Sequence, residues 1–224
     1  RFLLALKLNG WPKLLVPAIL GQALGIYLSH DANILALFLP LGFTLGILIY
    51  TPLLNDRGDA RVDLIKRRLF PQSSGVKTLA DGIFNAPFLL IAGGGALLGA
   101  LVCAFILAGY GERPWFLGGA VLGFLLFQAY SFFPLKLNYR GGGELLEMLG
   151  VGLVLPWLHA YAHSGLLWHP MFFLLLGLLP LSLASALAEW LEDEESDLVG
   201  GKCTFTTMWG NAAVRKAVGR IFAL

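Results

Sequence analysis

Six long apolar segments, separated by short polar stretches, dominate the hydropathy pattern of this 224-residue chain. They cover residues 11–29, 33–54, 83–109, 115–133, 145–163 and 170–191, and a seventh begins near residue 211. A helix needs about 20 apolar residues to cross the roughly 30 Å hydrocarbon core of a membrane. None of the segments alternates apolar and polar residues as barrel strands do. The pattern predicts an all-α integral membrane protein, a bundle of six to seven spanning helices.

The composition agrees with this class of protein. Hydrophobic residues make up 57% of the chain and charged residues 13%, and the mean hydropathy is +0.74. Ordinary soluble domains carry about 25% charged residues. The composition therefore excludes a soluble enzyme, a disordered tail and a nucleic-acid binder, and it makes the lipid bilayer the solvent. The two cysteines offer neither a disulfide framework nor a paired metal-ligand spacing.

The basic residues indicate the orientation of the bundle. The loops that share a side with the amino terminus are 55–82, 134–144 and 192–210, and those on the other side are 30–32, 110–114 and 164–169. Fifteen of the 16 Lys and Arg residues lie on the first side or at helix ends facing it, and Arg113 is the exception. By the positive-inside rule, this side faces the cytoplasm.

The ends of the sequence and its single run of apolar segments bear on the domain organisation. The chain starts at Arg1 without a cleavable signal pattern and stops at Leu224 as the seventh segment begins. We expect residues 1–224 to form one transmembrane domain within a longer polypeptide.

Acidic residues form two clusters. Nine of the 14 Asp and Glu residues lie in 56–63 and 189–197. In a helix, Asp56, Asp59 and Asp63 would share one face, and their mutual repulsion calls for a cation among them. Oxygen ligands with no His or Cys nearby favour a hard cation such as Mg²⁺.

The second cluster repeats the first. Asp193 and Asp197 are four residues apart, and each acidic segment is followed by a lysine and a threonine, with Lys77 after the first and Lys202 after the second. The clusters follow the second and sixth spans, which indicates an internal duplication of four-helix units.

Two acidic clusters with nearby lysines suit a diphosphate. Mg²⁺ bridges carboxylates to phosphate oxygens, and cations stabilise the charge that develops when an allylic carbon–oxygen bond breaks. The spans below would receive a long lipid tail, so an isoprenoid diphosphate fits both parts of the chain. The alternative is that both acidic loops are simply exposed to solvent and bind nothing. The matching spacing of the aspartates in the two loops disfavours this alternative.

These residues also carry a family resemblance. Residues 55–63 resemble the NDxxDxxxD motif of the UbiA superfamily of membrane prenyltransferases, and residues 193–197 resemble its DxxxD motif. Residues 201–204 resemble the G-K-x-T sequel, and residues 17–22 resemble the P-x-x-x-G stretch of the first helix. The resemblance implies a nine-helix bundle with a central cavity, of which the carboxyl-terminal part is missing here. It also implies two bound Mg²⁺ ions and transfer of a polyprenyl group to an aromatic acceptor.

The sequence indicates the acceptor less specifically than it indicates the metal and the isoprenoid donor. Residues 139–144 and Phe70-Pro71 with Lys77 most resemble the menaquinone-biosynthesis branch, which prenylates 1,4-dihydroxy-2-naphthoate in bacterial and archaeal cytoplasmic membranes. Prenylation of 4-hydroxybenzoate or another ring acceptor is the alternative. The resemblance fixes neither the prenyl length nor the oligomeric state.

The resemblance assigns roles to particular residues. Metal and substrate binding fall to the five aspartates Asp56, Asp59, Asp63, Asp193 and Asp197, with a substrate contact also from Asn55; catalytic roles fall to Lys77, Lys202, Tyr130, Lys136 and, as an alternative cation, Arg140. Independently of the resemblance, Asn9 near the start of the first span is expected to contact a substrate. Lys13 near the start of the first span either reaches a substrate or snorkels to the interface. Glu189 and Glu192 depart from the family pattern of Asn and Arg and make the second site more negative.

Two other classes of protein use similar residues. CDP-alcohol phosphotransferases carry D-x-x-D-G-x-x-A-R, but here Ala60 follows Asp59 and the second cluster lies more than a hundred residues away. A transporter or divalent-cation channel usually keeps ionisable groups inside the membrane. The six spans have no carboxylate away from their ends, which disfavours that class.

Overall fold

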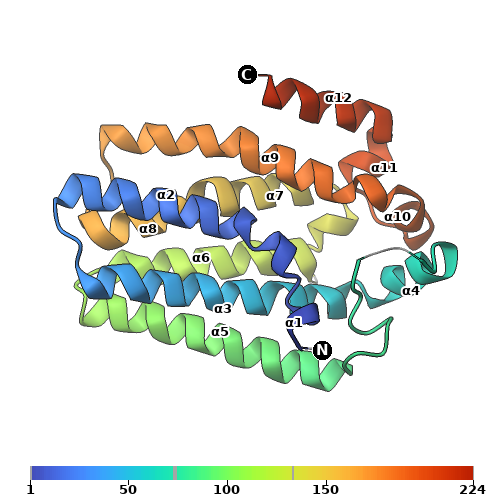
Figure 1. Cartoon of the computed structure of the whole chain (residues 1–224), viewed down its shortest axis with the longest axis horizontal. Helices are drawn as coiled ribbons and strands as arrows, with labels where there is room; N and C mark the ends of the chain where they lie inside the picture. Colours follow the sequence, from blue (N-terminus) through green and yellow to red (C-terminus); the bar gives the residue numbers. More distant parts are fainter. Residues whose placement is uncertain (1, 73–74, 133, 224) are drawn as a thin grey trace.

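The computed structural model describes residues 2–72, 75–132 and 134–223, and every regular element within these ranges is a helix (Figure 1). Six helical stretches are long and apolar enough to cross a membrane: Leu8–Ser29, Ile34–Gly58, Ala86–Gly109, Pro114–Ser131, Gly143–Ser164 and Pro170–Glu192. The predicted all-helical membrane bundle is confirmed. The expected end of the fourth span at residue 133 lies outside the described residues.

Several spans consist of more than one helical segment. In chain order they comprise η1 (Leu8–Gly10) with α2 (Pro12–Ser29), α3 (Ile34–Gly58), α5 (Ala86–Gly109), α6 (Pro114–Ser131), α7 (Gly143–Leu149) with η3 (Gly150–Val154) and α8 (Leu155–Ser164), and η4 (Pro170–Gly177) with α9 (Leu178–Glu189) and η5 (Trp190–Glu192). The hydropathy pattern did not reveal the π-helical turn η3 or the 3₁₀ start η4, because local winding leaves the apolar run unchanged.

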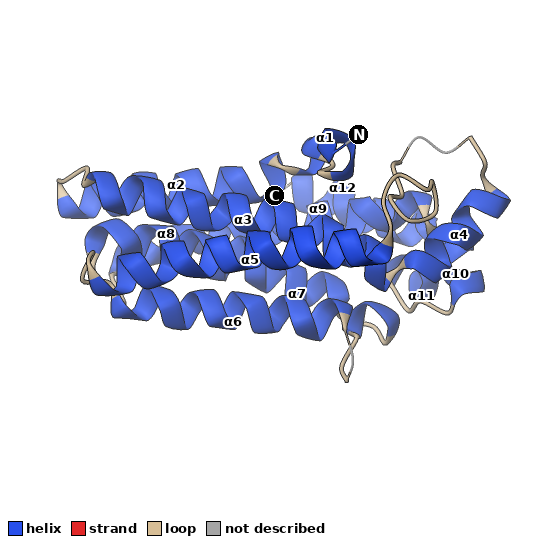
Figure 2. Ribbon diagram, turned by 90° about the horizontal axis from the view of Figure 1, so that it is seen from below, coloured by secondary structure: helices blue, strands red, loops and turns tan. Residues whose placement is uncertain are grey.

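In the described part of the chain, six shorter helices lie outside the spans, four of them within the expected polar loops. They are α1 (Phe2–Ala5), α4 (Ala60–Leu69), η2 (Leu137–Tyr139), α10 (Glu194–Gly200), α11 (Phe205–Trp209) and α12 (Asn211–Phe222). Both views place α4, α10 and α11 together at one end of the bundle, while the turns between α2 and α3, α5 and α6, and α8 and η4 lie at the other end (Figures 1 and 2). The predicted seventh segment begins at Asn211 as α12, which packs along α9.

Asparagine side chains cap two of the spanning helices. Asn33 Oδ1 accepts hydrogen bonds from the backbone amides of Leu35 and Ala36 at 2.9 and 3.2 Å, and so satisfies free amide donors at the start of α3. Asn85 Oδ1 accepts from the Phe88 amide at 2.9 Å at the start of α5. These caps explain why the helices begin directly after polar turns.

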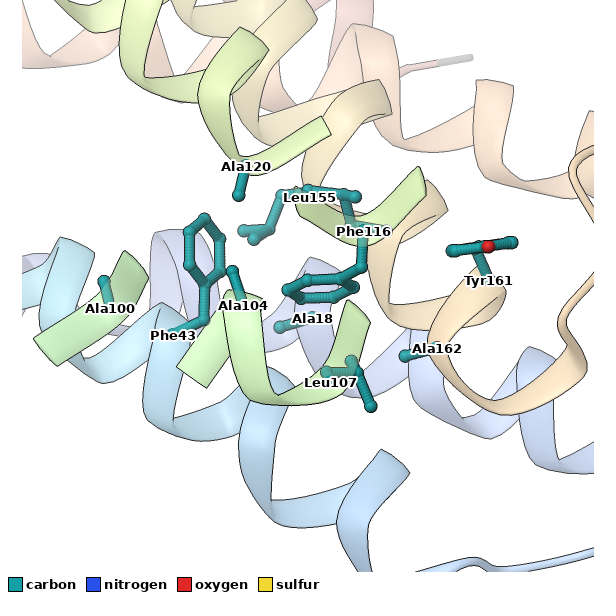
Figure 3. Packing of buried hydrophobic residues seen from close by; sticks show 11 residues of the cluster. Ala18, Phe43, Ala100, Ala104, Leu107, Phe116, Ala120, Leu155, Tyr161 and Ala162 are labelled. Carbon is teal, nitrogen blue, oxygen red and sulfur yellow. The ribbon is translucent and has the colours of Figure 1, made fainter. Parts of the chain in front are cut away.

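Glycines allow the spans to approach closely. A Cβ atom added at Gly21 of α2 would lie 2.2 Å from the carbonyl oxygen of Pro156 in α8, and one at Gly46 of α3 would lie 2.7 Å from that of Ala96 in α5. Small residues at helix crossings are typical of membrane bundles. Between α3 and α6, the rings of Phe43 and Phe116 pack edge to face with centroids 5.6 Å apart among buried alanines (Figure 3).

Candidate active site

The first acidic segment continues the second span. Helix α3 extends to Gly58, a break at Asp59 (φ −98°, ψ 5°) follows, and α4 begins at Ala60. Asp56, Asp59 and Asp63 are 1%, 4% and 4% exposed. The expected single helical face is therefore interrupted at Asp59, but all three carboxylates are buried. Buried carboxylates require partners.

Four lysines provide these partners, each to a different aspartate. Lys202 Nζ lies 2.7 Å from Asp59 Oδ2, and Lys77 Nζ lies 2.7 Å from Asp63 Oδ1. The two other pairs are Lys7 with Asp56 and Lys66 with Asp193. The lysines come from four separate parts of the chain, so the site assembles only when the whole chain has folded.

Neutral donors add further contacts to two of the carboxylates. Asp56 Oδ2 accepts hydrogen bonds from the amide and the hydroxyl of Thr78 at 2.9 and 2.8 Å. Asp59 accepts from the Tyr139 hydroxyl at 2.9 Å and from the Asn55 side-chain amide at 3.3 Å. Together with the lysines, these bonds give both oxygens of Asp56 and both oxygens of Asp59 a partner.

The second acidic segment lies against the first. Asp193 separates η5 from α10, and α10 packs on α4. The contact is close, because a Cβ atom added at Gly200 would lie 2.6 Å from a methyl group of Val62. The salt bridges of Lys66 and Lys202 then cross between the segments. The structure thus brings together all five predicted aspartates with Lys77 and Lys202.

Burial and charge shift several pKa values in the site. Burial raises the pKa of Asp63, and Lys77 opposes this shift. Burial opposes protonation of Lys77, but the charge and hydrogen bond of Asp63, together with the charges of Asp193 and Asp56, outweigh it and raise the pKa of the lysine. Asp197 has no lysine of its own, and burial raises its pKa to about 7. Its Oδ2 atom accepts no hydrogen bond from the described residues.

Aromatic rings surround Lys202. Its Nζ atom lies 4.2 Å from the ring centroid of Trp190 and 5.4 Å from that of Tyr139, both within cation–π range. Burial and the charge of Asp59 raise the pKa of the Tyr139 hydroxyl, so it remains a hydrogen-bond donor. The rings hold Lys202 at the junction of the two acidic segments.

An apolar cavity of about 270 Å³ adjoins this polar cluster. Lys7 and Asn55, which contact Asp56 and Asp59, also line the cavity. Its walls come mainly from α2, α3, α6, α7, η3 and α8, and Tyr130 of α6 lies among them. The expected central cavity is therefore present and adjoins the acidic cluster through Lys7 and Asn55.

The other predicted site residues lie farther from the carboxylates. Asn9 is exposed and is not among the residues that line the cavity. Lys136 Nζ lies 3.6 Å from the ring centroid of Tyr139. Arg140 is exposed, and within the described part of the chain it makes no hydrogen bond or ion pair with the five aspartates.

The carboxylates fit a hard cation by donor type. Oxygen ligands without His or Cys suit Mg²⁺. Among the described residues, no three Asp, Glu, His or Cys side chains converge as a preformed metal cluster. Instead, lysine ammonium groups lie against four of the five carboxylates and balance their charge. Metal binding would require these lysines to release the carboxylates.

Sequence reasoning missed several members of the cluster. Lys7 precedes the first span and Tyr139 lies in a 3₁₀ turn, so no spacing rule links them to the aspartates. Thr78 was noted only as the threonine after Lys77, and its hydrogen bonds to Asp56 were not predicted. Lys66 is buried and paired rather than exposed at the membrane surface. Its position three residues after Asp63, on the same helical face, was the one available signal.

The fold and site define a helical membrane bundle in which a cluster of buried aspartates and lysines adjoins an apolar cavity. The solved structure of a UbiA homolog from Archaeoglobus fulgidus bound to DMAPP and Mg²⁺ has the same fold, with a TM-score of 0.72 and 14% sequence identity. The alignment covers 100% of this chain and 74% of that chain. No protein-family model and no curated protein sequence matches the chain. The chain therefore has a UbiA-like fold.

Proposed function

We propose that the chain is a Mg²⁺-dependent prenyltransferase of the UbiA superfamily that transfers a polyprenyl group from an isoprenoid diphosphate to an aromatic acceptor. One observation carries the proposal: two acidic segments, cross-linked by lysines, adjoin an apolar cavity. The UbiA homolog of similar fold is bound to an isoprenoid diphosphate and Mg²⁺, which supports the same ligands here.

The five aspartates would hold the metal, with two ions expected. Mg²⁺ bound there would neutralise the diphosphate and the charge that grows on it as it leaves. Lys77 and Lys202 are paired with Asp63 and Asp59 in the structure. With those carboxylates holding metal, the two ammonium groups would be free to donate hydrogen bonds to phosphate oxygens.

The cavity would receive the prenyl chain and exclude water from the reacting carbon. The carbon–oxygen bond of the donor breaks, and its electron pair leaves with the diphosphate. A carbon of the acceptor ring supplies the electron pair of the new carbon–carbon bond, and the ring proton leaves to water at the cavity mouth. Tyr130 lines this wall, where an aromatic face stabilises developing positive charge.

Other features of the proposal rest on the sequence. Lys136 and Arg140, in the loop after α6, are proposed to contact the diphosphate, and Asn9 to contact a substrate at the mouth. The acceptors to examine first are 1,4-dihydroxy-2-naphthoate and 4-hydroxybenzoate. We propose that the site faces the cytoplasm, because the basic residues gather at its end of the bundle. The internal duplication stays a prediction.

Membranes containing the protein test this function. They are incubated with labelled isoprenoid diphosphates of increasing length and a panel of aromatic acceptors, with and without Mg²⁺. We expect a prenylated product only when metal, donor and acceptor are all present. Cation flux into proteoliposomes without any product would contradict the proposal and favour a channel.

A further inference from the structure

Three charged residues form a second cluster on the wall of the cavity, separate from the aspartates. Lys13 of α2 makes salt bridges with both Glu147 of α7 and Glu189 of α9. All three residues line the cavity. The cluster joins α2, α7 and α9. Because its side chains line the cavity, its charges also act on any molecule bound there.

With both glutamates ionised, the cluster leaves the wall with one net negative charge. One ammonium group faces two carboxylates, so the positive charge of Lys13 is already balanced before any further anion binds. The side chains of Lys13 and Glu147 are 19% and 13% exposed, whereas that of Glu189 is 56% exposed. Glu189 therefore presents its carboxylate to whatever occupies the mouth of the cavity.

The remaining polar lining does not compensate this charge. Among the described residues that line the cavity, the other lysine is Lys7, which is paired with Asp56; metal held by Asp56 would leave Lys7 beside the metal–diphosphate site. Asn55, Thr51, Tyr50 and Tyr130 are neutral side chains. A molecule bound against the wall of Lys13, Glu147 and Glu189 thus meets two carboxylates and no cation other than Lys13.

These charges discriminate between acceptors. A carboxylate placed on this wall either stays unpaired or takes Lys13 from a glutamate, and both cost free energy in a partly desolvated site. A hydroxyl group instead donates a charge-assisted hydrogen bond to a glutamate without disturbing the pair. Such a bond also increases the electron density of the ring that attacks the donor.

We infer that the wall formed by Lys13, Glu147 and Glu189 selects an uncharged, hydroxyl-bearing aromatic acceptor over one that carries a carboxylate. The inference rests on the proposed prenyl transfer and narrows its acceptor. It disfavours 1,4-dihydroxy-2-naphthoate and favours the corresponding diol without the carboxylate. Glu189 and Glu147 act as specificity-determining residues that contact the acceptor.

Matched acceptor pairs provide the test. The purified protein is assayed with Mg²⁺ and one donor against 1,4-dihydroxynaphthalene and 1,4-dihydroxy-2-naphthoate, and against phenol and 4-hydroxybenzoate. We expect kcat/KM to be at least about tenfold higher for the uncharged member of each pair, since a buried unpaired charge is strongly rejected. A preference for the carboxylates would overturn the inference.

Variants connect the preference to the wall. Glu189→Gln keeps the shape but removes one negative charge, so the preference ratio should shift about tenfold toward the carboxylate acceptor, through the acceptor KM and with the donor KM unchanged. Glu147→Gln should act in the same direction and replaces Glu189→Gln if that variant does not fold. Glu195→Gln, the same substitution at an exposed position of α10 outside the cavity, should leave the ratio unchanged.

The outcomes separate this inference from the proposed function. An unchanged ratio in both wall variants, with transfer intact, would overturn the inference alone. A protein that neither binds a labelled isoprenoid diphosphate in the presence of Mg²⁺ nor prenylates any acceptor would overturn the proposed function, and the inference with it.

Discussion

Lys202 Nζ lies 2.7 Å from Asp59 Oδ2, although 143 residues separate the two in sequence. Both side chains are buried, at 5% and 4% exposure. The pair joins the end of the second acidic segment to the first, so the two segments form one charged site. Breaking a buried ion pair by removing one partner costs about 3–5 kcal/mol, because a charge is left without compensation.

This pair gives a double-mutant prediction. Lys202→Met should lower the free energy of unfolding by about 3 kcal/mol and abolish prenyl transfer. Adding Asp59→Asn should recover much of the stability, since no unpaired charge remains, but none of the activity. Thermal unfolding in detergent and a transfer assay measure the two effects. Lys216→Met on exposed α12 is the control and should change neither.

The crossing of α2 and α8 gives a stability prediction. Gly21→Ala would force a methyl group to within 2.2 Å of the Pro156 carbonyl oxygen, so it should destabilise the bundle by about 1–3 kcal/mol. Gly94→Ala of α5 has open space around its new Cβ and should be neutral or slightly stabilising, because alanine favours a helix. Equal melting temperatures for the two variants would show that the crossing is less tight than described.

The position of Phe43 on the cavity wall leads to a prediction about the length of the prenyl donor. Phe43 lines the cavity and precedes Asn55 on α3 by twelve residues, or about 18 Å of helix. Phe43→Leu should lengthen the cavity and raise the kcat/KM ratio for a donor one isoprene unit longer by about tenfold. Phe105→Leu, on an exposed face of α5, should leave the ratio unchanged. Competition between two labelled donors measures it.

An ion pair between α4 and the loop that follows it should make the stability of the protein depend on pH. Arg67 donates hydrogen bonds of 2.5 and 2.7 Å to the two oxygens of Asp81, and this lowers the pKa of the carboxyl group. The stabilisation is therefore complete above the unfolded pKa of about 3.9 and is lost as the pH falls through the folded value.

The wild-type melting temperature should consequently fall more steeply than that of Asp81→Asn as the pH drops below about 4. At pH 6 the two proteins should differ by no more than about 1 kcal/mol, because the pair is partly exposed. Parallel pH curves for the two proteins would contradict the role of Arg67.

Apolar length and charge placement were enough to predict the helical bundle and the two acidic segments. A span of about 20 apolar residues has few alternatives in a membrane. The sequence also indicated that Lys77 and Lys202 follow the acidic segments, and the structure places both beside an aspartate. Local spacing was sufficient for these residues.

The remaining contacts depend on tertiary packing. Lys7 precedes α2 and Lys13 lies at its start, and they reach Asp56 and Glu147 only because α2 packs against α3 and against the span that contains α7, η3 and α8. No periodicity in the sequence predicts such pairs. The sequence also suggested residues that the fold leaves away from the aspartates. Asn9 lies near the first span and Arg140 belongs to a motif, but both are exposed.

The most direct measurement of the central claim is Mg²⁺-dependent prenyl transfer from a labelled donor, compared among the wild type, Asp59→Asn and Asp193→Asn. If the two acidic segments form one metal–diphosphate site, each single variant should lose at least about a hundredfold in transfer, and the double variant should lose little more than either alone. Glu195→Gln should retain wild-type activity. Full transfer by the double variant, or equal transfer without Mg²⁺, would contradict the account.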